Sequence, residues 1–264
     1  HGPVPGLSPS TRDNGPFFDV SIKPDPADHP SPPRPPRGGA GRPTVNLPRT
    51  VGGLIAVNVV VYVLTAVMPV GWAAAVTFEL GFVPARYGAP NGPGWQGLLG
   101  PVTHQFLHAG PIHLLINMVM LAAFGSGVER LLGGRRLLAL YLASGLAGAA
   151  LHFAVYPASS VPVVGASGAI SGLFGAVLRL MARQSHVLGT RTPVLPIAAL
   201  WIGIAVLTGF TGVPGATGGA QVAWAAHVGG FLLGLLAFDV FAIGTRLRGR
   251  GRPRYLRDAD DDSG

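Results

Sequence analysis

The sequence has no cysteine and few charged residues. Without cysteine the chain can form neither a disulfide framework nor a thiolate metal site, and cysteine usage says nothing about its compartment. Charged residues make up 11% and hydrophobic residues 48% of the 264 residues. An average soluble domain has roughly 25% charged residues. The composition therefore excludes an ordinary soluble domain and indicates a membrane protein that contacts a lipid bilayer.

The charge that is present is mostly positive. Lys and Arg number 19 against 11 Asp and Glu, which gives a formal net charge of +8. A basic chain can bind nucleic acid, bind anionic lipid, or use its charge to set its membrane topology. The positions of the arginines decide among these possibilities.

The first 48 residues differ from the rest of the chain. Residues 1–48 contain many Pro and Gly residues with scattered charge, and such a segment cannot bury enough apolar surface to fold alone. We interpret it as a disordered tail and not as a proline motif that docks a partner. The first residue is His, and no signal peptide precedes the first apolar run, so we expect a trimmed or partial start.

Six apolar runs follow this tail. Each is close to the ~20 residues that cross ~30 Å of hydrocarbon as a helix. Backbone groups in lipid must bond within their own segment, so the runs predict helices and not open strands. We therefore expect an all-α membrane protein with six transmembrane helices over residues 49–245. The runs are Val51–Val70, Ile112–Val128, Leu137–Tyr156, Gly165–Met181, Val194–Phe210 and Val222–Ile243.

The arginines gather in alternate connections between the runs. Clusters lie before the first run, between the second and third, around the connection of the fourth and fifth, and after the last, whereas the other connections carry only Arg86. By the positive-inside rule both termini are cytoplasmic. Residues 246–264 then form an Arg-rich and finally acidic cytoplasmic tail. Because the basic charge is explained by topology, we expect no nucleic-acid partner.

Ser167 and His227 are polar residues inside two of the apolar runs. A Ser is tolerated in a membrane helix because its hydroxyl can bond a carbonyl one turn earlier. An ionisable ring is costly there and indicates a functional site by default. Both runs have the same predicted direction, so both residues lie in the outer leaflet. If they face each other, the imidazole can take the hydroxyl proton and activate Ser167 as a nucleophile.

Two more polar residues lie at a similar depth. His113 and Asn117 are four residues apart, so they share one face of the second predicted helix near its outer end. The fourth and sixth runs also carry stripes of small residues, which let two helices approach closely. The stripes are Gly168 with Gly172, and Gly230 with Gly234.

Two other polar features have plainer interpretations. His104, His108 and His113 suggest a metal site, but no carboxylate accompanies the three rings, so we expect neither a metal nor a cofactor. Asp239 lies twelve residues beyond His227, about 18 Å at helical rise, and cannot orient that ring. We interpret Asp239 as a paired or snorkelling charge near the inner face.

With these motifs the sequence resembles the rhomboid family of intramembrane serine proteases. The resemblance covers about residues 50–245, and the spacings from His108 to His113 and from His113 to Asn117 are also similar to those of the family. The matching segments are Phe106-Leu107-His108, His113-Leu114, Asn117-Met118, Gly125 with Glu129-Arg130 and Gly133, Gly165-Ala166-Ser167-Gly168, and Ala226-His227-Val228-Gly229-Gly230 with Gly234.

The resemblance implies a role for each residue at the matching positions. Ser167 would be the nucleophile and His227 its general base, a dyad without a third carboxylate. His113 and Asn117, together with the backbone N–H of Ser167, would stabilise the oxyanion. The residues expected to have structural roles near the site are His108, Gly165, Gly168 and Gly230.

The sequence departs from the family pattern at two places. Many members have Trp-Arg shortly before the His-containing run, where this chain has Leu99-Gly100. Many also have an aromatic residue four positions after the nucleophile, where this chain has Ser171. Neither departure removes a reacting group.

The function implied is an endopeptidase that cleaves transmembrane or juxtamembrane segments of other membrane proteins, in a bacterial plasma membrane. An alternative is a catalytically silent rhomboid-like protein that binds and escorts membrane clients, although the intact Ser-His pair argues against it. A transporter would show inverted repeats with broken helices, which are not seen in the sequence. The substrate and the oligomeric state are left open.

Overall fold

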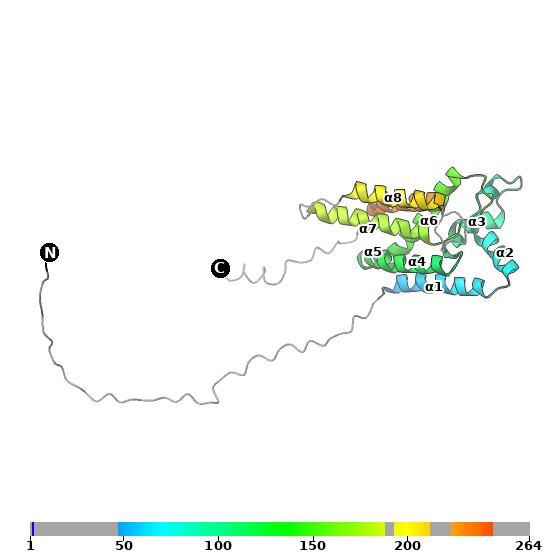
Figure 1. Ribbon diagram of the computed structural model, residues 1–264, viewed down its shortest axis with the longest axis horizontal. Coiled ribbons are helices and arrows are strands. Elements are labelled where there is room, and N and C mark those ends of the chain that lie inside the picture. Colours follow the sequence, from blue (N-terminus) through cyan, green and yellow to red (C-terminus); the bar gives the residue numbers. More distant parts are fainter. Residues whose placement is uncertain (1, 3–46, 188–192, 212–222, 245–264) are drawn as a thin grey trace, which may run out of the picture. The chain divides into compact units, whose positions relative to one another are not determined.

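The computed structural model describes residues 2, 47–187, 193–211 and 223–244 (Figure 1). The two predicted tails lie outside the described residues, apart from residues 2, 47 and 48. The described part is helical, and within it the only β-type pairing is a single antiparallel bridge between Phe82 and Val163.

Every apolar run of the sequence contains a helix. The described α-helices are α1 (Arg49–Ala66), α2 (Val70–Leu80), α3 (Gly94–Thr103), α4 (Pro111–Met120), α5 (Ser126–Leu132), α6 (Gly134–Val155), α7 (Ser167–Val187), α8 (Val194–Thr211) and α9 (Trp224–Phe241). The shorter elements are the 3₁₀ turns η1 (Pro84–Gly88) and η2 (His104–Phe106) and the π-turn η3 (Leu121–Gly125).

Four segments of the described chain are long and apolar enough to cross a membrane: Arg49–Ala66, Pro111–Leu132, Gly134–Val155 and Trp224–Phe241. The second of these is the continuous run of α4, η3 and α5. Of the remaining two long helices, α7 carries Arg179 and Arg183 toward its C-terminal end, and the apolar stretch described in α8 is shorter. The all-helical membrane fold is therefore present, with four clear spans.

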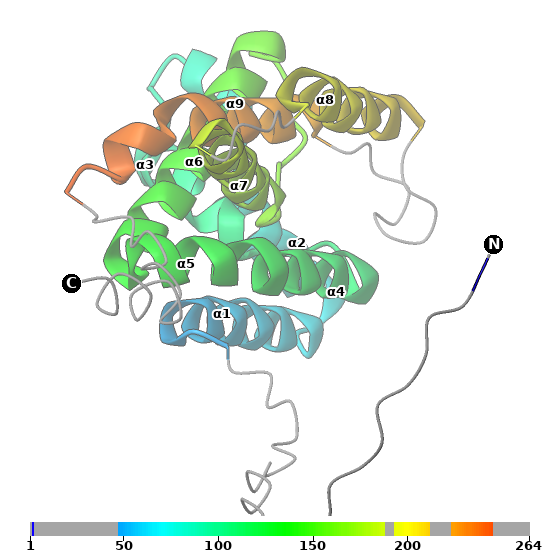
Figure 2. The same cartoon turned by 90° about the vertical axis from the view of Figure 1, so that its left-hand side faces the viewer.

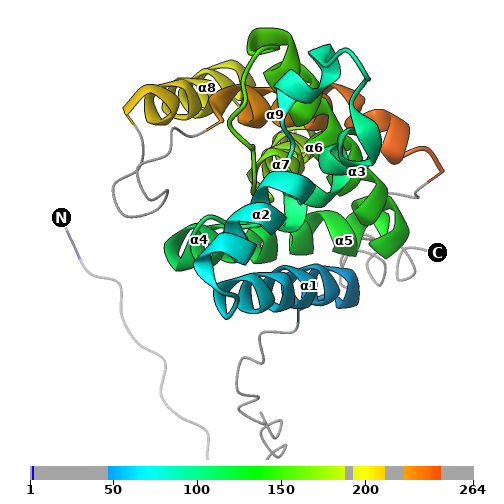
Figure 3. The ribbon, with the colours of Figure 1, turned by 90° about the vertical axis from the view of Figure 1, so that its right-hand side faces the viewer.

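The bundle is built around α7. Figures 2 and 3 show α7 in the middle, with α6 and α9 on one side and the α4–α5 segment on the other, while α1 lies beyond α4 and α5. The main apolar core lies where α7 meets α4, η3 and α6, and it includes the fully buried Leu121, Leu140, Tyr141 and Leu173. A second cluster, with Phe231 and Leu178 at its centre, joins α8 to α7 and α9.

Glycines bring α7 and α9 into backbone contact. A Cβ added at Gly230 would collide with the carbonyl oxygen of Gly168, and one at Gly234 would collide with that of Gly172. Both small-residue stripes of the sequence therefore lie in the same interface. No larger residue fits between these helices at this separation.

A carboxylate holds the beginning of α1. Glu129 of α5 accepts hydrogen bonds from the backbone N–H groups of Thr50 and Val51, at 3.0 and 2.8 Å. These are first-turn donors that have no partner within the helix, and a negative charge is favourable at this end of the helix dipole. Glu129 thus supplies the cap that Pro48, at the N-cap position, has no side-chain group to provide.

Asp239 is a paired charge. Its two carboxylate oxygens accept hydrogen bonds from Arg179 and Arg183 of α7, each with a shortest distance of 2.7 Å. The ion pairs join α7 to α9 at the end of the interface away from Ser167. Because all three side chains are about 40% exposed, we assign them a modest contribution to stability.

The segment between α1 and α4 is more ordered than the sequence predicts. The first apolar run was expected to form one helix to Val70, but α1 ends at Ala66 and α2 begins at Val70, because Pro69 cannot continue a helix. Helices α2 and α3 then fold back, and Phe82 and Val163 exchange backbone hydrogen bonds of 3.1 and 2.8 Å. This bridge ties the segment to the stretch immediately before Ser167.

Candidate active site

A strained turn places Ser167 at the first position of α7. Gly165 has φ +122°, a conformation that residues with a Cβ rarely adopt, and its N–H donates a 2.8 Å hydrogen bond to the carbonyl of His104. A Cβ at Gly165 would lie only 2.8 Å from the ring of His113. The backbone therefore passes close to the His113 ring just before the chain enters α7.

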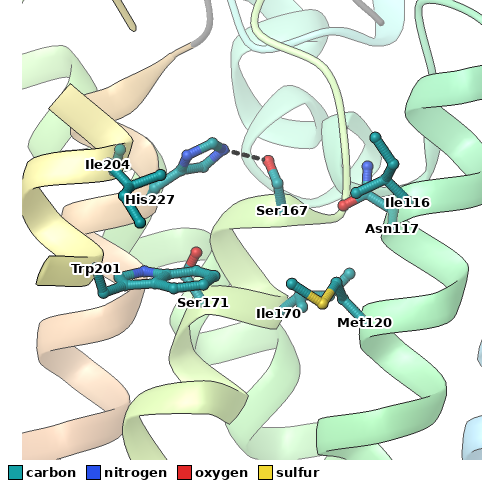
Figure 4. Close-up of a pocket in the computed structure, with 10 residues that line it drawn as sticks. Ile116, Asn117, Met120, Ser167, Ile170, Ser171, Trp201, Ile204 and His227 are labelled. Atoms are coloured by element: carbon teal, nitrogen blue, oxygen red, sulfur yellow. Dashed lines mark hydrogen bonds between the residues drawn. The ribbon is translucent and has the colours of Figure 1, made fainter. Parts of the chain in front are cut away.

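Ser167 and His227 are hydrogen-bonded to each other. The distance between Ser167 Oγ and His227 Nε2 is 2.7 Å, and the two side chains face each other across the α7–α9 interface (Figure 4). When the ring proton is on Nδ1, the Ser hydroxyl donates to Nε2, which is the arrangement needed for proton transfer from Ser to His. Both residues are half-buried.

A hydrogen bond to the residue that follows α6 fixes the start of α9. The indole Nε1 of Trp224 donates a 2.8 Å hydrogen bond to the hydroxyl of Tyr156, and the two rings meet edge to face. Trp224 is three residues before His227, close to one helical turn. The bond thus fixes the end of the helix that carries the imidazole. Nothing in the sequence distinguished this pair.

His113 and Asn117 lie on the opposite side of Ser167. Asn117 is buried, and its Nδ2 donates a 3.0 Å hydrogen bond to the carbonyl of His113 one turn earlier. An amide nitrogen has a second hydrogen, so Asn117 can still donate to another acceptor. The structure therefore brings Ser167, His227, His113 and Asn117 together from α4, α7 and α9.

His108 and His104 support the site from the segment before α4. The His108 ring packs edge to face against His113, with 5.1 Å between the ring centroids. His104 is buried, and its Nδ1 donates a 3.0 Å hydrogen bond to the carbonyl of Gly100. The sequence indicated His104 only as a metal candidate, whereas here its carbonyl also receives the N–H of Gly165. Within the described residues no cluster of three or more metal-ligating side chains occurs.

Burial keeps these two histidines neutral. Burial lowers the pKa of His104 to about 4, with hydrogen bonding to Gly100 opposing the shift. Burial, with the neighbouring His113 ring, lowers the pKa of His108 to about 3. Both groups lie outside the membrane-spanning segments, in the connection before α4.

A cavity of about 230 Å³ opens beside Ser167. It lies where four helices meet, and Figure 4 shows α4 and α8 on opposite sides with Ser167 and His227 at one end. Apart from the polar groups at that end and the Ser171 hydroxyl, its lining is almost entirely apolar. The lining residues are Ile116, Asn117 and Met120 of α4, Ser167, Ile170 and Ser171 of α7, Trp201, Ile204 and Ala205 of α8, and His227 of α9.

The site is thus a hydrogen-bonded Ser-His pair between two helices of an all-helical membrane bundle. The sequence matches the Rhomboid domain family over residues 96–242, more than half of the chain. The chain belongs to the rhomboid family, which confirms the resemblance seen in the sequence, and it is an integral membrane protein.

Individual relatives match over a third to more than half of the chain. The chain is 35% identical to YdcA of Bacillus subtilis (strain 168) over 153 residues, which is 56% of this chain and 70% of that protein. It is 33% identical to the rhomboid protease GluP of the same organism over 147 residues, 54% of this chain and only 25% of GluP. A match to Inactive RHOMBOID-like protein 8 of Arabidopsis thaliana, 30% identical over 116 residues (44% of this chain, 31% of that protein), means that family membership alone does not establish catalysis.

We predict that the folded state loses stability as the pH falls from 7 to 5. The unfolded chain protonates its histidines near pH 6.5, whereas folded His104 and His108 stay neutral until about pH 4 and 3, so the unfolded state binds more protons in this range. Each histidine should then cost about 2 kcal/mol of stability at pH 5. Melting temperatures of the protein in detergent at pH 7, 6 and 5 measure the effect.

The matched variant is His104→Gln, which keeps a side-chain N–H for the Gly100 carbonyl but cannot titrate. Its melting temperature should depend less steeply on pH than that of the wild type. An equal dependence in the two proteins would contradict the assignment to His104.

Proposed function

We propose that this chain is an intramembrane serine endopeptidase. The observation that carries the proposal is the 2.7 Å hydrogen bond between Ser167 and His227, inside a rhomboid-family bundle. A structural histidine in lipid needs only some hydrogen-bond partner. A Ser Oγ on its Nε2, with further hydrogen-bonding groups on the other side of that oxygen, is the geometry of nucleophilic catalysis.

In the proposed reaction Ser167 Oγ attacks the scissile carbonyl carbon while His227 Nε2 takes the hydroxyl proton. The carbonyl oxygen becomes an oxyanion, which the Ser167 N–H, the free N–H of Asn117 and the His113 ring stabilise. His227 then gives its proton to the departing amine as the C–N bond breaks. A water molecule attacks the acyl-enzyme in the same way, and Ser167 regains its proton.

The structural residues have clear parts in this scheme. Gly165 lets the backbone turn beside the His113 ring, and Gly168 and Gly230 allow the approach of α7 to α9 that joins Ser167 to His227. His108 supports the His113 ring. No cofactor or metal has a part in this scheme.

The substrates we propose are transmembrane or juxtamembrane segments of other membrane proteins. A soluble folded protein cannot reach a site that is buried between membrane helices. The polypeptides present at that depth of the bilayer are the transmembrane and juxtamembrane segments of other membrane proteins. The alternative, an escort protein without catalysis, would be indicated if the purified wild-type protein bound such segments but cleaved none of them.

Replacing Ser167 with Ala should abolish proteolysis without unfolding the protein. Loss of a nucleophile costs on the order of 10⁶ in kcat for a soluble serine protease, and Ser167 is surrounded by small residues that tolerate Ala. The assay is cleavage of a model transmembrane substrate by the purified full chain, with covalent labelling by a fluorophosphonate. The matched control is Ser126→Ala, the same change at a buried Ser whose hydroxyl has no hydrogen-bond partner among the described residues. Turnover by Ser167→Ala would refute the dyad.

The Asn117→Ala variant distinguishes a protease from a protein that only binds its clients. Deleting one oxyanion donor typically lowers kcat by about 10²–10³, and because His113 and the Ser167 N–H remain, we expect the lower end of this range. The apparent substrate affinity should change little, since the oxyanion exists only in the transition state. A normal kcat in a protein with a normal melting temperature would remove Asn117 from the site.

We also propose the topology that the arginines predict: six spans over residues 49–245, both termini cytoplasmic, and tails at 1–48 and 246–264, in a bacterial plasma membrane. A cysteine-free chain allows a direct test. In intact cells a membrane-impermeant thiol reagent should label an Ala89→Cys variant in the connection between η1 and α3. A Ser263→Cys variant should react only after the cells are permeabilised. Labelling of Ser263→Cys in intact cells would reverse the topology.

A further inference from the structure

The first turn of α9 carries His227 but is held weakly by its own backbone. Ala223, at the N-cap position, makes no side-chain cap hydrogen bond. The backbone N–H of His227 donates to the carbonyl of Ala223 over 3.4 Å, which is longer than the usual ~2.9 Å. Helix ends fray when their first-turn donors lack good partners. The orientation of the imidazole therefore depends on contacts from outside α9.

Packing fixes how close this turn lies to its neighbours but not its rotation. Ala225 and Ala226 are buried, and a Cβ added at Gly148 of α6 would collide with the carbonyl oxygen of Ala226. The burial of methyl groups has no preferred direction around the helix axis. A side chain reaches about 5–6 Å from that axis, so a rotation of about 10° would move the His227 ring by about 1 Å.

Trp224 makes the directional contact that this turn otherwise lacks. Its indole Nε1 donates the 2.8 Å hydrogen bond to the Tyr156 hydroxyl, and the two rings meet at 86° with 6.4 Å between their centroids. Trp224 and His227 are three residues apart, so their side chains are separated by about 60° around the helix. A bond that fixes Trp224 therefore also fixes the direction in which the His227 ring leaves α9.

Tyr156 is itself fixed on the end of α6. Its backbone N–H donates a 2.8 Å hydrogen bond to the carbonyl of His152, and its ring packs against the His152 ring with 5.1 Å between the centroids. His152 is buried in α6. Trp and Tyr are also common at membrane–water interfaces, because their rings are apolar and their N–H and O–H groups are polar. Simple interfacial anchoring is therefore the alternative that the test must exclude.

We propose that Trp224 and Tyr156 are positioning residues for the general base, and that their hydrogen bond holds α9 in the rotation at which His227 Nε2 meets Ser167 Oγ at 2.7 Å. This inference rests on the proposed protease function and adds to it two residues that do not line the cavity beside Ser167. Loss of the bond should impair proton transfer and leave substrate binding unchanged.

The test uses the full chain in detergent with the variants Trp224→Phe and Tyr156→Phe. Each variant keeps an aromatic ring and removes one half of the hydrogen bond. We expect kcat to fall about tenfold with KM unchanged, since a misplacement of about 1 Å can cost up to ~10²-fold in rate. Labelling of Ser167 by a fluorophosphonate should slow by a similar factor, because this small probe needs the Ser-His pair but no docked transmembrane segment. Melting temperatures identify any variant that is less stable.

A double variant and a matched control separate positioning from anchoring. The double variant Trp224→Phe with Tyr156→Phe should be no slower than either single variant, because the first substitution already removes the bond. Trp72→Phe makes the same change at a Trp of α2 that is 72% exposed. It should leave kcat and the labelling rate unchanged. If one of the two single variants is unstable, the other carries the test.

Three results would overturn the inference and leave the protease function standing. These are normal kcat and labelling in the single variants, independent losses that multiply in the double variant, and a loss of equal size in Trp72→Phe. A rise in KM without a fall in kcat would also overturn it, because it would assign the pair to substrate binding. A wild type without Ser167-dependent cleavage or labelling would instead refute the protease function itself.

Discussion

The backbone contact between α7 and α9 is the constraint on which the site depends. Ser167 and His227 have short reaches, so their side chains can bond at 2.7 Å only if the two helix axes are unusually close. Gly230 and Gly234 meet the carbonyls of Gly168 and Gly172, where no Cβ would fit. In lipid, where apolar burial does not drive helices together, such close packing is itself a main source of attraction. The same glycines therefore stabilise the bundle and set the distance between the two proposed reacting groups.

Several strongly polar groups of this bundle have specific partners. Asn117 donates to its own helix, Glu129 accepts from the first turn of α1, and Asp239 binds two arginines. Each arrangement avoids leaving a strong donor, acceptor or charge alone in an apolar environment. The Ser-His pair follows the same rule, because each group is the other's partner in the resting state.

Much of the fold could be predicted because hydrophobic length is a strong signal in a membrane protein. All six apolar runs contain helices. Helix α1 ends at Ala66, four residues before the predicted end at Val70, because Pro69 stops the helix although its neighbours are apolar. The sequence analysis did not predict the short helices α2 and α3. Their segments are too short to be recognised as transmembrane spans and too apolar to be recognised as loops.

The pairing of Ser167 with His227 was a conditional expectation from the similar depth that the arginine topology predicts, and in the structure the two side chains are hydrogen-bonded. The cavity could not be foreseen, because its walls come from four helices and its size depends on which side chains are small where they meet. Trp201 gave no signal in a uniformly apolar run. Trp224 and Tyr156 likewise lie far apart in the sequence, and only the packing of α6 against α9 brings them into contact.

The π-turn η3 affects where the sequence of this span could lose a residue. A π-turn holds one residue more than an α-turn, and each residue rotates a helix by about 100°. Between Asn117, which faces the cavity, and Glu129, which faces α1, the orientation of the two ends of this span depends on that extra residue at Leu121–Gly125. Deleting one residue there would let this stretch become a regular α-helix in which both ends keep their faces, whereas a deletion elsewhere in α4 or α5 would turn one end against the other by about 100°. The π-turn is therefore the place in this span where the chain could lose one residue and keep the site and the anchor of α1 aligned, although Leu121 is fully buried and a Cβ at Gly125 would lie 2.9 Å from Val51.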